Sequence, residues 1–278
     1  MLTIVALAIV TALVWVTITT VWLWRHQERV VFQPPSVWAD APAPARRVTF
    51  CAADGHELFG YLLTPRSGAG STTVTIAFHG NADLAAWTVP WAREAAELTG
   101  SVVLIPEYRG YAGIPGLPTY ESASADARGV VSFALDSLRP SDIVLFGHSL
   151  GSAVATELAL YMQETLGIRP RALVLQSPFT SAMEMAARML VPPIPWLWKR
   201  ISRVHYDTRN LVARLDTPVF VAHGTRDLNI PSRMGVQVFR SAQHPGELLL
   251  VQGAGHNDVA DVGGERYWQW LVAATVDP

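Results

Sequence analysis

The sequence has 278 residues, a formal net charge of −2 and one cysteine, and 50% of its residues are hydrophobic. A single cysteine excludes an intramolecular disulfide and a cysteine-cluster metal site. The balanced charge gives nucleic-acid binding no electrostatic basis, and the apolar content excludes a disordered chain. Charged residues make up 16%, below the roughly 25% of a typical soluble domain. We therefore expect a lipid-facing segment, a large core, or both.

The N-terminal segment, residues 2–24, contains no charged side chain. A helix of this length measures about 34 Å, enough to cross a bilayer core. Trp15, Trp22 and Trp24 lie in its C-terminal half, as interfacial aromatic residues do. A cleaved signal peptide is one alternative, but no basic residue precedes the run and no small-residue cleavage site follows it. A buried core helix is another, although such helices rarely lack a polar face. Residues 1–24 are therefore predicted to be a single-pass transmembrane anchor.

Basic residues follow the predicted anchor, whereas only the terminal amine precedes it. By the positive-inside rule, Arg25, Arg29, Arg46 and Arg47 favour a cytoplasmic location for the rest of the chain. That preference rests on these four side chains alone. Residues 25–47 are predicted to be a juxtamembrane linker, because four prolines fall within residues 33–45 and leave little periodicity.

The remaining chain, residues 48–278, is predicted to form one domain of alternating strands and helices. The predicted strands are residues 48–52, 58–64, 74–78, 102–105, 143–146, 172–175, 219–222 and 248–251. The predicted helices are residues 85–98, 122–138, 151–166, 231–242 and 265–274, the second capped by Ser122 or Ser124. Short apolar strands between helices indicate an α/β fold with a mostly parallel central sheet covered on both faces.

Residues 181–206 break this alternation with several prolines, tryptophans and methionines. We predict a short cap insertion over the C-terminal edge of the sheet. One interpretation packs its apolar side on the domain. A sharper hypothesis places Trp196 and Trp198 at the lipid interface, with the basic residues that follow on anionic headgroups (Lys199, Arg200 and Arg203). The anchor is expected to be separable, so that a protein without residues 1–32 stays folded and active.

Residues 147–151 read Gly-His-Ser-Leu-Gly between a predicted strand and a predicted helix. This G-x-S-x-G pattern in a strand–turn–helix context is the nucleophile elbow, whose strained turn has no room for side chains at the glycine positions. The alternative is a glycine-rich turn without chemistry. We predict Ser149 as the nucleophile.

A serine nucleophile needs a base, and the base needs an orienting acid, in the chain order Ser, Asp or Glu, His. Four histidines follow Ser149, namely His205, His223, His244 and His256. His256 follows the last predicted strand and is the predicted base. Asp227 follows the preceding strand and is the predicted acid, while Asp258 is predicted to stabilise the loop that carries His256.

An oxyanion hole requires two backbone N–H donors. The first is predicted at Leu150, directly after the nucleophile. The second is expected in the loop after the 74–78 strand, at Asn81 or, failing that, at Ala82. His79 in the same loop is interpreted as a residue that braces the loop rather than as a base.

Six segments carry a family resemblance. They are FHGNADLAAW (78–87), YRGYAGIPGLPTYESASADA (108–127), VLFGHSLGSAVATELA (144–159), LVLQSPFTS (173–181), HGTRDLNIP (223–231) and VQGAGHND (251–258). In family order across residues 48–260, they resemble the alpha/beta-hydrolase superfamily. Within it, they are similar to the membrane-anchored ABHD-type and bud-emergence-type serine hydrolases. The resemblance implies the alpha/beta-hydrolase fold and a triad of Ser149, Asp227 and His256. Departures at Ala112, Ile114 and His148 leave the substrate class open.

These observations predict a membrane-anchored serine hydrolase that cleaves carboxylic esters or thioesters, including lipid or acyl substrates, through an acyl-enzyme. No metal or cofactor is implied. The expected partners are a small-molecule or lipid ester and the membrane, without nucleic acid; the oligomeric state is not indicated. A serine peptidase or amidase of the same fold is one alternative, and a catalytically silent, membrane-tethered binding protein is another. A haloalkane dehalogenase would need a carboxylate in place of Ser149.

Overall fold

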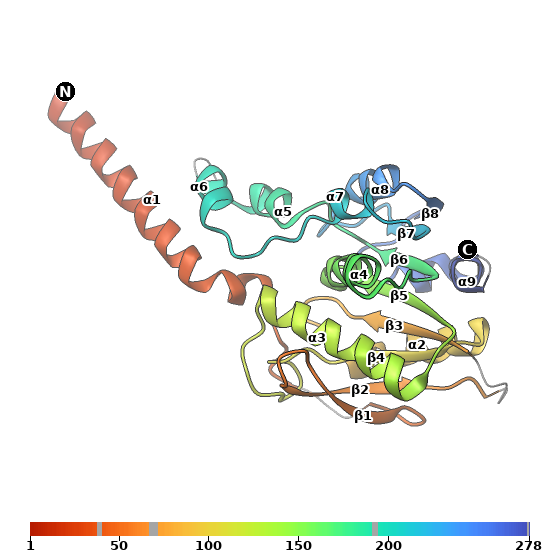
Figure 1. The fold of residues 1–278 in the computed structure, drawn as a ribbon. Coiled ribbons are helices and arrows are strands. Elements are labelled where there is room, and N and C mark those ends of the chain that lie inside the picture. The colour runs from red at the N-terminus through yellow and green to blue at the C-terminus, as the bar shows by residue number, and fades with distance from the viewer. Residues whose placement is uncertain (38–40, 67–71, 191–193, 277) are drawn as a thin grey trace.

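The computed structural model describes residues 1–37, 41–66, 72–190, 194–276 and 278. Its centre is an eight-stranded sheet in the order β1-β2-β4-β3-β5-β6-β7-β8 (Figure 1). The strands are β1 (Arg46–Cys51), β2 (Glu57–Leu63), β3 (Thr73–Phe78), β4 (Val102–Pro106), β5 (Asp142–His148), β6 (Ala172–Gln176), β7 (Val219–Gly224) and β8 (Pro245–Val251). β2 runs antiparallel to both neighbours, and the other pairs are parallel. The predicted mostly parallel sheet is confirmed.

Helices cover both faces of the sheet, as predicted. α2 (Ala85–Thr99) and α9 (Val259–Val276) contact each other on one face. The other face carries α3 (Tyr120–Phe133), α4 (Leu150–Tyr161), α7 (Thr208–Val212) and α8 (Ser232–Ser241). α3 and α4 continue into single π-helical turns, Ala134–Leu138 and Met162–Leu166. This arrangement buries the central strands on both sides.

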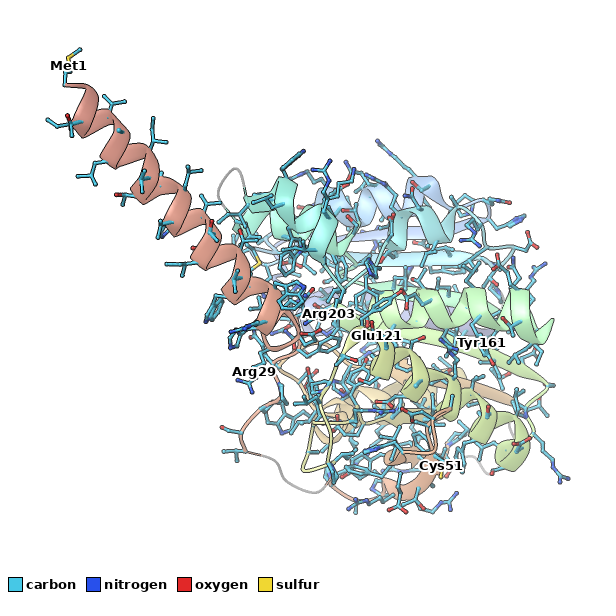
Figure 2. All side chains as sticks on the ribbon, turned by 60° about the vertical axis from the view of Figure 1, so that its left-hand side comes forward. Met1, Arg29, Cys51, Glu121, Tyr161 and Arg203 are labelled. Carbon is cyan, nitrogen blue, oxygen red and sulfur yellow. The ribbon has the colours of Figure 1, made fainter. Side chains whose placement is uncertain are left out.

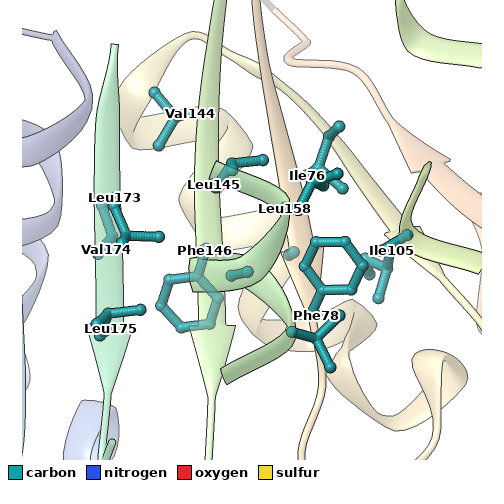
Figure 3. Close-up of a cluster of buried hydrophobic side chains, with 14 of the residues drawn as sticks. Ile76, Phe78, Ile105, Val144, Leu145, Phe146, Leu158, Leu173, Val174 and Leu175 are labelled. Atoms are coloured by element: carbon teal, nitrogen blue, oxygen red, sulfur yellow. The ribbon is translucent and has the colours of Figure 1, made fainter. Parts of the chain in front are cut away.

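The core lies around β3, β5 and β6, whose apolar residues are buried (Figure 3). Ile76 and Leu145 are fully buried. Phe146 packs against Trp91 of α2 in a tilted arrangement, with 4.2 Å between the ring centroids. A strand buried on both faces has no polar alternation, so these strands could be identified from composition alone. Their C-terminal ends carry the loops that form the site.

The starts of two helices, α3 and α9, differ from the prediction. The N-cap of α3 is Thr119, whose hydroxyl accepts the backbone N–H of Ser122, while the Ser122 side chain accepts the N–H of Thr119. This reciprocal capping box makes Ser122 the third residue of the helix rather than its cap. α9 begins at Val259, earlier than expected, because a kink at Gly264 (φ 52°) joins two helical segments.

The first helix, α1 (Leu2–Val31), is longer than the predicted anchor. The anchor is predicted to end at residue 24 and a linker to begin at residue 25, but the helix continues until shortly before Pro34. A residue that precedes proline disfavours the helical conformation, so the natural end lies here. Residues 3–31 form a helix long and apolar enough to cross a membrane, which a signal sequence would also provide.

The two ends of α1 have different surroundings. Its N-terminal turns project from the body, and their side chains stand clear of it (Figure 2). Its C-terminal turns are packed: Leu23 and Gln27 are buried, and Phe32, just beyond the helix, belongs to the main core. The C-terminal end of α1 therefore packs against the body, and the separability of the anchor stays a prediction.

The cap insertion contains α5 (Ala182–Met189) and α6 (Ile194–Ile201). α6 contacts α1, and Leu23 is buried against Ile194 and Trp198. The lipid-interface hypothesis fails for Trp198, which is 6% exposed, whereas Trp196 is 62% exposed. Arg203, one of the basic residues that the hypothesis places on lipid headgroups, instead forms an ion pair with Glu28 of α1.

Candidate active site

The structure brings together the three residues predicted to form a triad. Ser149 lies between β5 and α4, Asp227 follows β7, and His256 follows β8. Ser149 Oγ is 2.9 Å from His256 Nε2, and His256 Nδ1 is 2.6 Å from Asp227 Oδ2. The geometry is that of a hydroxyl, a base and an orienting acid connected in series.

The backbone at Ser149 adopts φ 53° and ψ −116°, a conformation that side-chain-bearing residues rarely adopt. Two glycines permit this turn. A Cβ on Gly147 would lie 2.3 Å from the carbonyl oxygen of Gly151, and a Cβ on Gly151 would lie 2.2 Å from that of Phe78. The Ser149 N–H is held by the Gln176 carbonyl at 2.9 Å. The glycines of the motif are therefore required by close backbone packing.

The buried carboxylate of Asp227 is surrounded by donors. Oδ1 accepts the backbone N–H groups of Asn229 and Ile230 at 2.9 and 2.8 Å. His223 Nε2 lies 3.2 Å from Oδ2. Burial alone would raise the pKa of Asp227, but the hydrogen bonds from His223, His256 and Ile230 outweigh it and hold that pKa well below its ordinary value. Asp227 is therefore ionised at neutral pH and holds the His256 ring through Nδ1.

His223 is a part of the site that the sequence analysis did not assign. Its ring is fully buried, and its Nε2 lies 2.8 Å from the Ile230 carbonyl as well as near Asp227. A Cβ on Gly235 would lie 2.3 Å from His223 Nδ1, so α8 approaches the ring closely. The position at the end of β7 was visible in the sequence, but the partnership with Asp227 depends on the fold of the loop between them.

Two further residues fix the loop that carries His256. His148 Nε2 lies 3.2 Å from the His256 carbonyl. Burial, and then the neighbouring His256, lower the pKa of His148 to about 4, so His148 is neutral at pH 7. Asp258 Oδ1 accepts the Gly255 N–H at 2.6 Å, in agreement with its predicted role in stabilising the loop.

The loop predicted to supply the second oxyanion donor is held through the side chain of Asn81. Its Oδ1 accepts the backbone N–H of Gln33 at 2.7 Å and the hydroxyl of Tyr111 at 3.0 Å. The next residue, Ala82, has a φ of 52°, so the backbone turns sharply here. The contact with Gln33 connects this loop directly to the end of α1.

His79 braces the same loop, as expected, and makes no bond to the triad. It is buried, with Nε2 2.8 Å from Glu107 Oε1 and Nδ1 2.9 Å from the Gly80 carbonyl. Burial lowers the pKa of His79, but the adjacent Glu107 carboxylate more than offsets this and raises it overall. Glu107 Oε2 also accepts the N–H of Ala85 at 3.0 Å, at the start of α2. Glu107 therefore joins the loop to the helix that follows it.

The loop after β4 is pinned by Arg109, which the sequence analysis left without a role. The Arg109 guanidinium contacts Asp126 Oδ1 at 2.6 Å and Asp54 Oδ2 at 2.7 Å. Asp126 is almost entirely buried, so its charge requires this partner. The pair fixes the loop that presents Tyr111 to Asn81.

A cavity of about 990 Å³ lies beside the triad, with Ser149 and His256 in its wall. Most of its other walls are apolar and come from three separate parts of the chain. They include Leu23, Val30 and Val31 of α1, Trp87 and Trp91 of α2, and Met185, Met189 and Trp198 of the cap insertion. Within the described ranges, no group of three or more His, Cys, Asp or Glu side chains could hold a metal ion.

Comparison with known proteins agrees with this architecture. An esterase of Pyrococcus furiosus has the same fold, with a TM-score of 0.64 at 19% identity over 87% of this chain and 100% of that one. An uncharacterized protein of Mycobacterium tuberculosis is 34% identical over 244 residues, which are 85% of this chain and 82% of that protein. Human alpha/beta hydrolase domain-containing protein 17B is 30% identical over 167 residues, 59% of this chain and 52% of its own length. The sequence profile of the Alpha/beta hydrolase family matches residues 76–214, and the chain therefore belongs to the alpha/beta hydrolase family.

Proposed function

We propose that this hydrolase is a membrane-anchored serine esterase or thioesterase that acts through an acyl-enzyme. The observation that carries the proposal is the unbroken series of hydrogen-bond distances from Ser149 through His256 to Asp227, 2.9 and 2.6 Å long. The apolar cavity beside Ser149 suits the acyl part of an ester.

In the proposed reaction, His256 Nε2 accepts the Ser149 proton as Oγ attacks the substrate carbonyl. The ionised Asp227 keeps the His256 proton on Nδ1 and stabilises the imidazolium that forms. The oxyanion accepts hydrogen bonds from the backbone N–H groups of Leu150, at the N-terminus of α4, and Asn81. His256 returns the proton to the leaving alcohol or thiol, and water then releases the acid by the same steps.

A fluorophosphonate probe tests the nucleophile directly. The probe should label the wild-type protein at Ser149, and Ser149→Ala should abolish both labelling and ester hydrolysis, with a loss of activity on the order of 10⁶-fold. Ser132→Ala on the exposed side of α3 is the matched control and should leave both unchanged. A folded wild-type protein that resists the probe would instead support the silent binding protein.

The amidase alternative uses the same triad, so the substrate must separate the two. Matched p-nitrophenyl esters and p-nitroanilides of the same acyl groups should show faster turnover of the esters. Preference for the anilides would assign the protein to the peptidase or amidase class.

We propose α1 as the membrane anchor because its N-terminal turns are apolar and exposed. Full-length protein should remain in the membrane pellet after alkaline carbonate extraction, and its N-terminus should be uncleaved. A reporter fused after Pro278 should be active on the cytoplasmic side, because Arg25 and Arg29 follow the apolar run. A reporter active only on the opposite side would reverse the orientation, and a cleaved N-terminus would indicate a signal peptide.

A further inference from the structure

The C-terminal turns of α1 are attached to the catalytic body by specific polar contacts. Gln27 is fully buried, and its Oε1 accepts the backbone N–H of Arg203 at 2.7 Å. The Arg203 guanidinium donates to both carboxylate oxygens of Glu28 at 2.6 and 2.7 Å and to the Trp24 carbonyl at 3.1 Å. Figure 2 shows Arg203 where the helix meets the body. These contacts fix the position of α1 relative to the cap insertion, so α1 is more than a tether.

The same helix face continues into the cavity. Leu23, Gln27, Val30 and Val31 are spaced i, i+4, i+7 and i+8 and lie on one side of α1. The three apolar members of this set line the cavity that contains Ser149. Gln27 in their midst is bonded to the backbone of Arg203, so the face is oriented toward the body rather than toward solvent.

This face begins next to the end of the uncharged run and lines the cavity that contains Ser149. The uncharged run ends at Trp24, one residue after Leu23. Val31 lies eight residues beyond Leu23, or about 12 Å along the helix axis. Leu23 and Ser149 nevertheless line the same cavity. An acyl chain attached at Ser149 and extending through this cavity can therefore contact the apolar side chains of α1.

We infer that Leu23, Val30 and Val31 are specificity-determining residues, and that the substrate is an ester or thioester carrying a long acyl chain that binds against α1. The inference rests on the proposed function and adds the substrate class to it. Hydrolysis consumes one water and yields the fatty acid and an alcohol or thiol. A short acyl group would occupy only the part of the cavity next to Ser149, so its hydrolysis would not depend on α1.

The first test narrows the cavity from the α1 side. Val30→Phe and Val31→Phe are made in the full-length protein in detergent micelles and assayed with p-nitrophenyl acetate and p-nitrophenyl palmitate. We expect the ratio of kcat/KM for the palmitate to kcat/KM for the acetate to fall about tenfold or more. Val21→Phe is the matched control, because Val21 lies on the exposed surface of the same helix, and it should change neither value.

A variant that enlarges the cavity separates an effect of cavity shape from an effect of misfolding. Val30→Ala widens the cavity and should raise the relative rate for acyl groups bulkier than palmitate. An unchanged ratio of palmitate to acetate activity in all three wall variants would overturn the inference, as would equal losses on both esters. Either result, with acetate hydrolysis still dependent on Ser149, would leave the proposed function intact.

The second test measures contact directly. A long-chain alkyl fluorophosphonate with a diazirine near the end of its chain is attached to Ser149 and then photolysed. Mass spectrometry should locate the cross-link within residues 23–31. Cross-links confined to α2 and the cap insertion would refute the role of α1, and failure of the probe to attach to Ser149 would refute the proposed function instead.

Discussion

Replacing Asp227 with asparagine tests the acid of the triad with almost no change of shape. Oδ1 of Asp227 accepts two backbone N–H groups, so the amide oxygen must take this position. The amide nitrogen then occupies the position of Oδ2, 2.6 Å from His256 Nδ1, where it can only donate. His256 must accept at Nδ1 and carry its proton on Nε2, which faces the Ser149 hydroxyl. The base is thus placed in the wrong tautomer.

The wrong tautomer should lower kcat by about 10⁴-fold, as for the equivalent change in serine-protease triads, which corresponds to about 5 kcal/mol in the activation barrier. The assay is steady-state hydrolysis of p-nitrophenyl acetate by full-length protein, with thermal unfolding to confirm folding. Asp258→Asn is the control; this side chain accepts the Gly255 N–H, and the loss should be tenfold or less. Activity within tenfold of wild type for Asp227→Asn, or a 10⁴-fold loss for Asp258→Asn, would refute the assignment.

Three further predictions concern stability. Glu107→Gln should lower the free energy of unfolding by about 3 kcal/mol in urea titrations, because it leaves a buried His79 without its counter-charge, whereas exposed Glu247→Gln should not. Because the pKa of His79 is raised in the folded protein, its charged form stabilises the fold at pH values below the ordinary pKa of 6.5, and this stabilisation is lost as the pH rises through the folded-state pKa. The difference in the free energy of unfolding between wild type and His79→Gln should therefore shrink above pH 6.5. A protein lacking residues 1–32 should be less stable than one lacking residues 1–22 by about 3 kcal/mol, because only the longer protein keeps the buried Phe32.

Local patterns were sufficient to predict the sheet and the triad. β5 and β6 are buried on both faces, so their apolar runs stand out without any knowledge of neighbours. The strained turn at Ser149 needs glycines on either side, and the sequence displays them. Asp227 and His256 follow successive strands, and parallel strands bring such loops to one edge of the sheet. Each of these inferences depends on residues close together in the chain.

Contacts between distant segments could not be predicted in this way. Residues 25–31 are predicted from the sequence to belong to a linker, because their partner Arg203, which contacts Gln27 and Glu28, lies far along the chain. In the sequence, His223 is a residue at the end of a strand; its contact with Asp227 depends on the fold of the loop between the two residues. In both cases the local sequence is compatible with several environments, and only tertiary packing selects one.

The rigid junction between α1 and the body has a consequence for how the enzyme would find its substrate. A catalytic domain on a flexible linker samples a broad volume above the bilayer. With α1 inserted as proposed, this domain would instead be restricted to lateral diffusion in the plane of the membrane and rotation about the helix axis. The final turns from Arg25 to Val31 measure about 10 Å along the helix axis, and they would hold the cavity that contains Ser149 close to the membrane surface. Turnover would then follow the mole fraction of substrate among the surrounding lipids rather than its bulk concentration, and diluting the membrane with inert lipid would slow the enzyme even at constant total substrate.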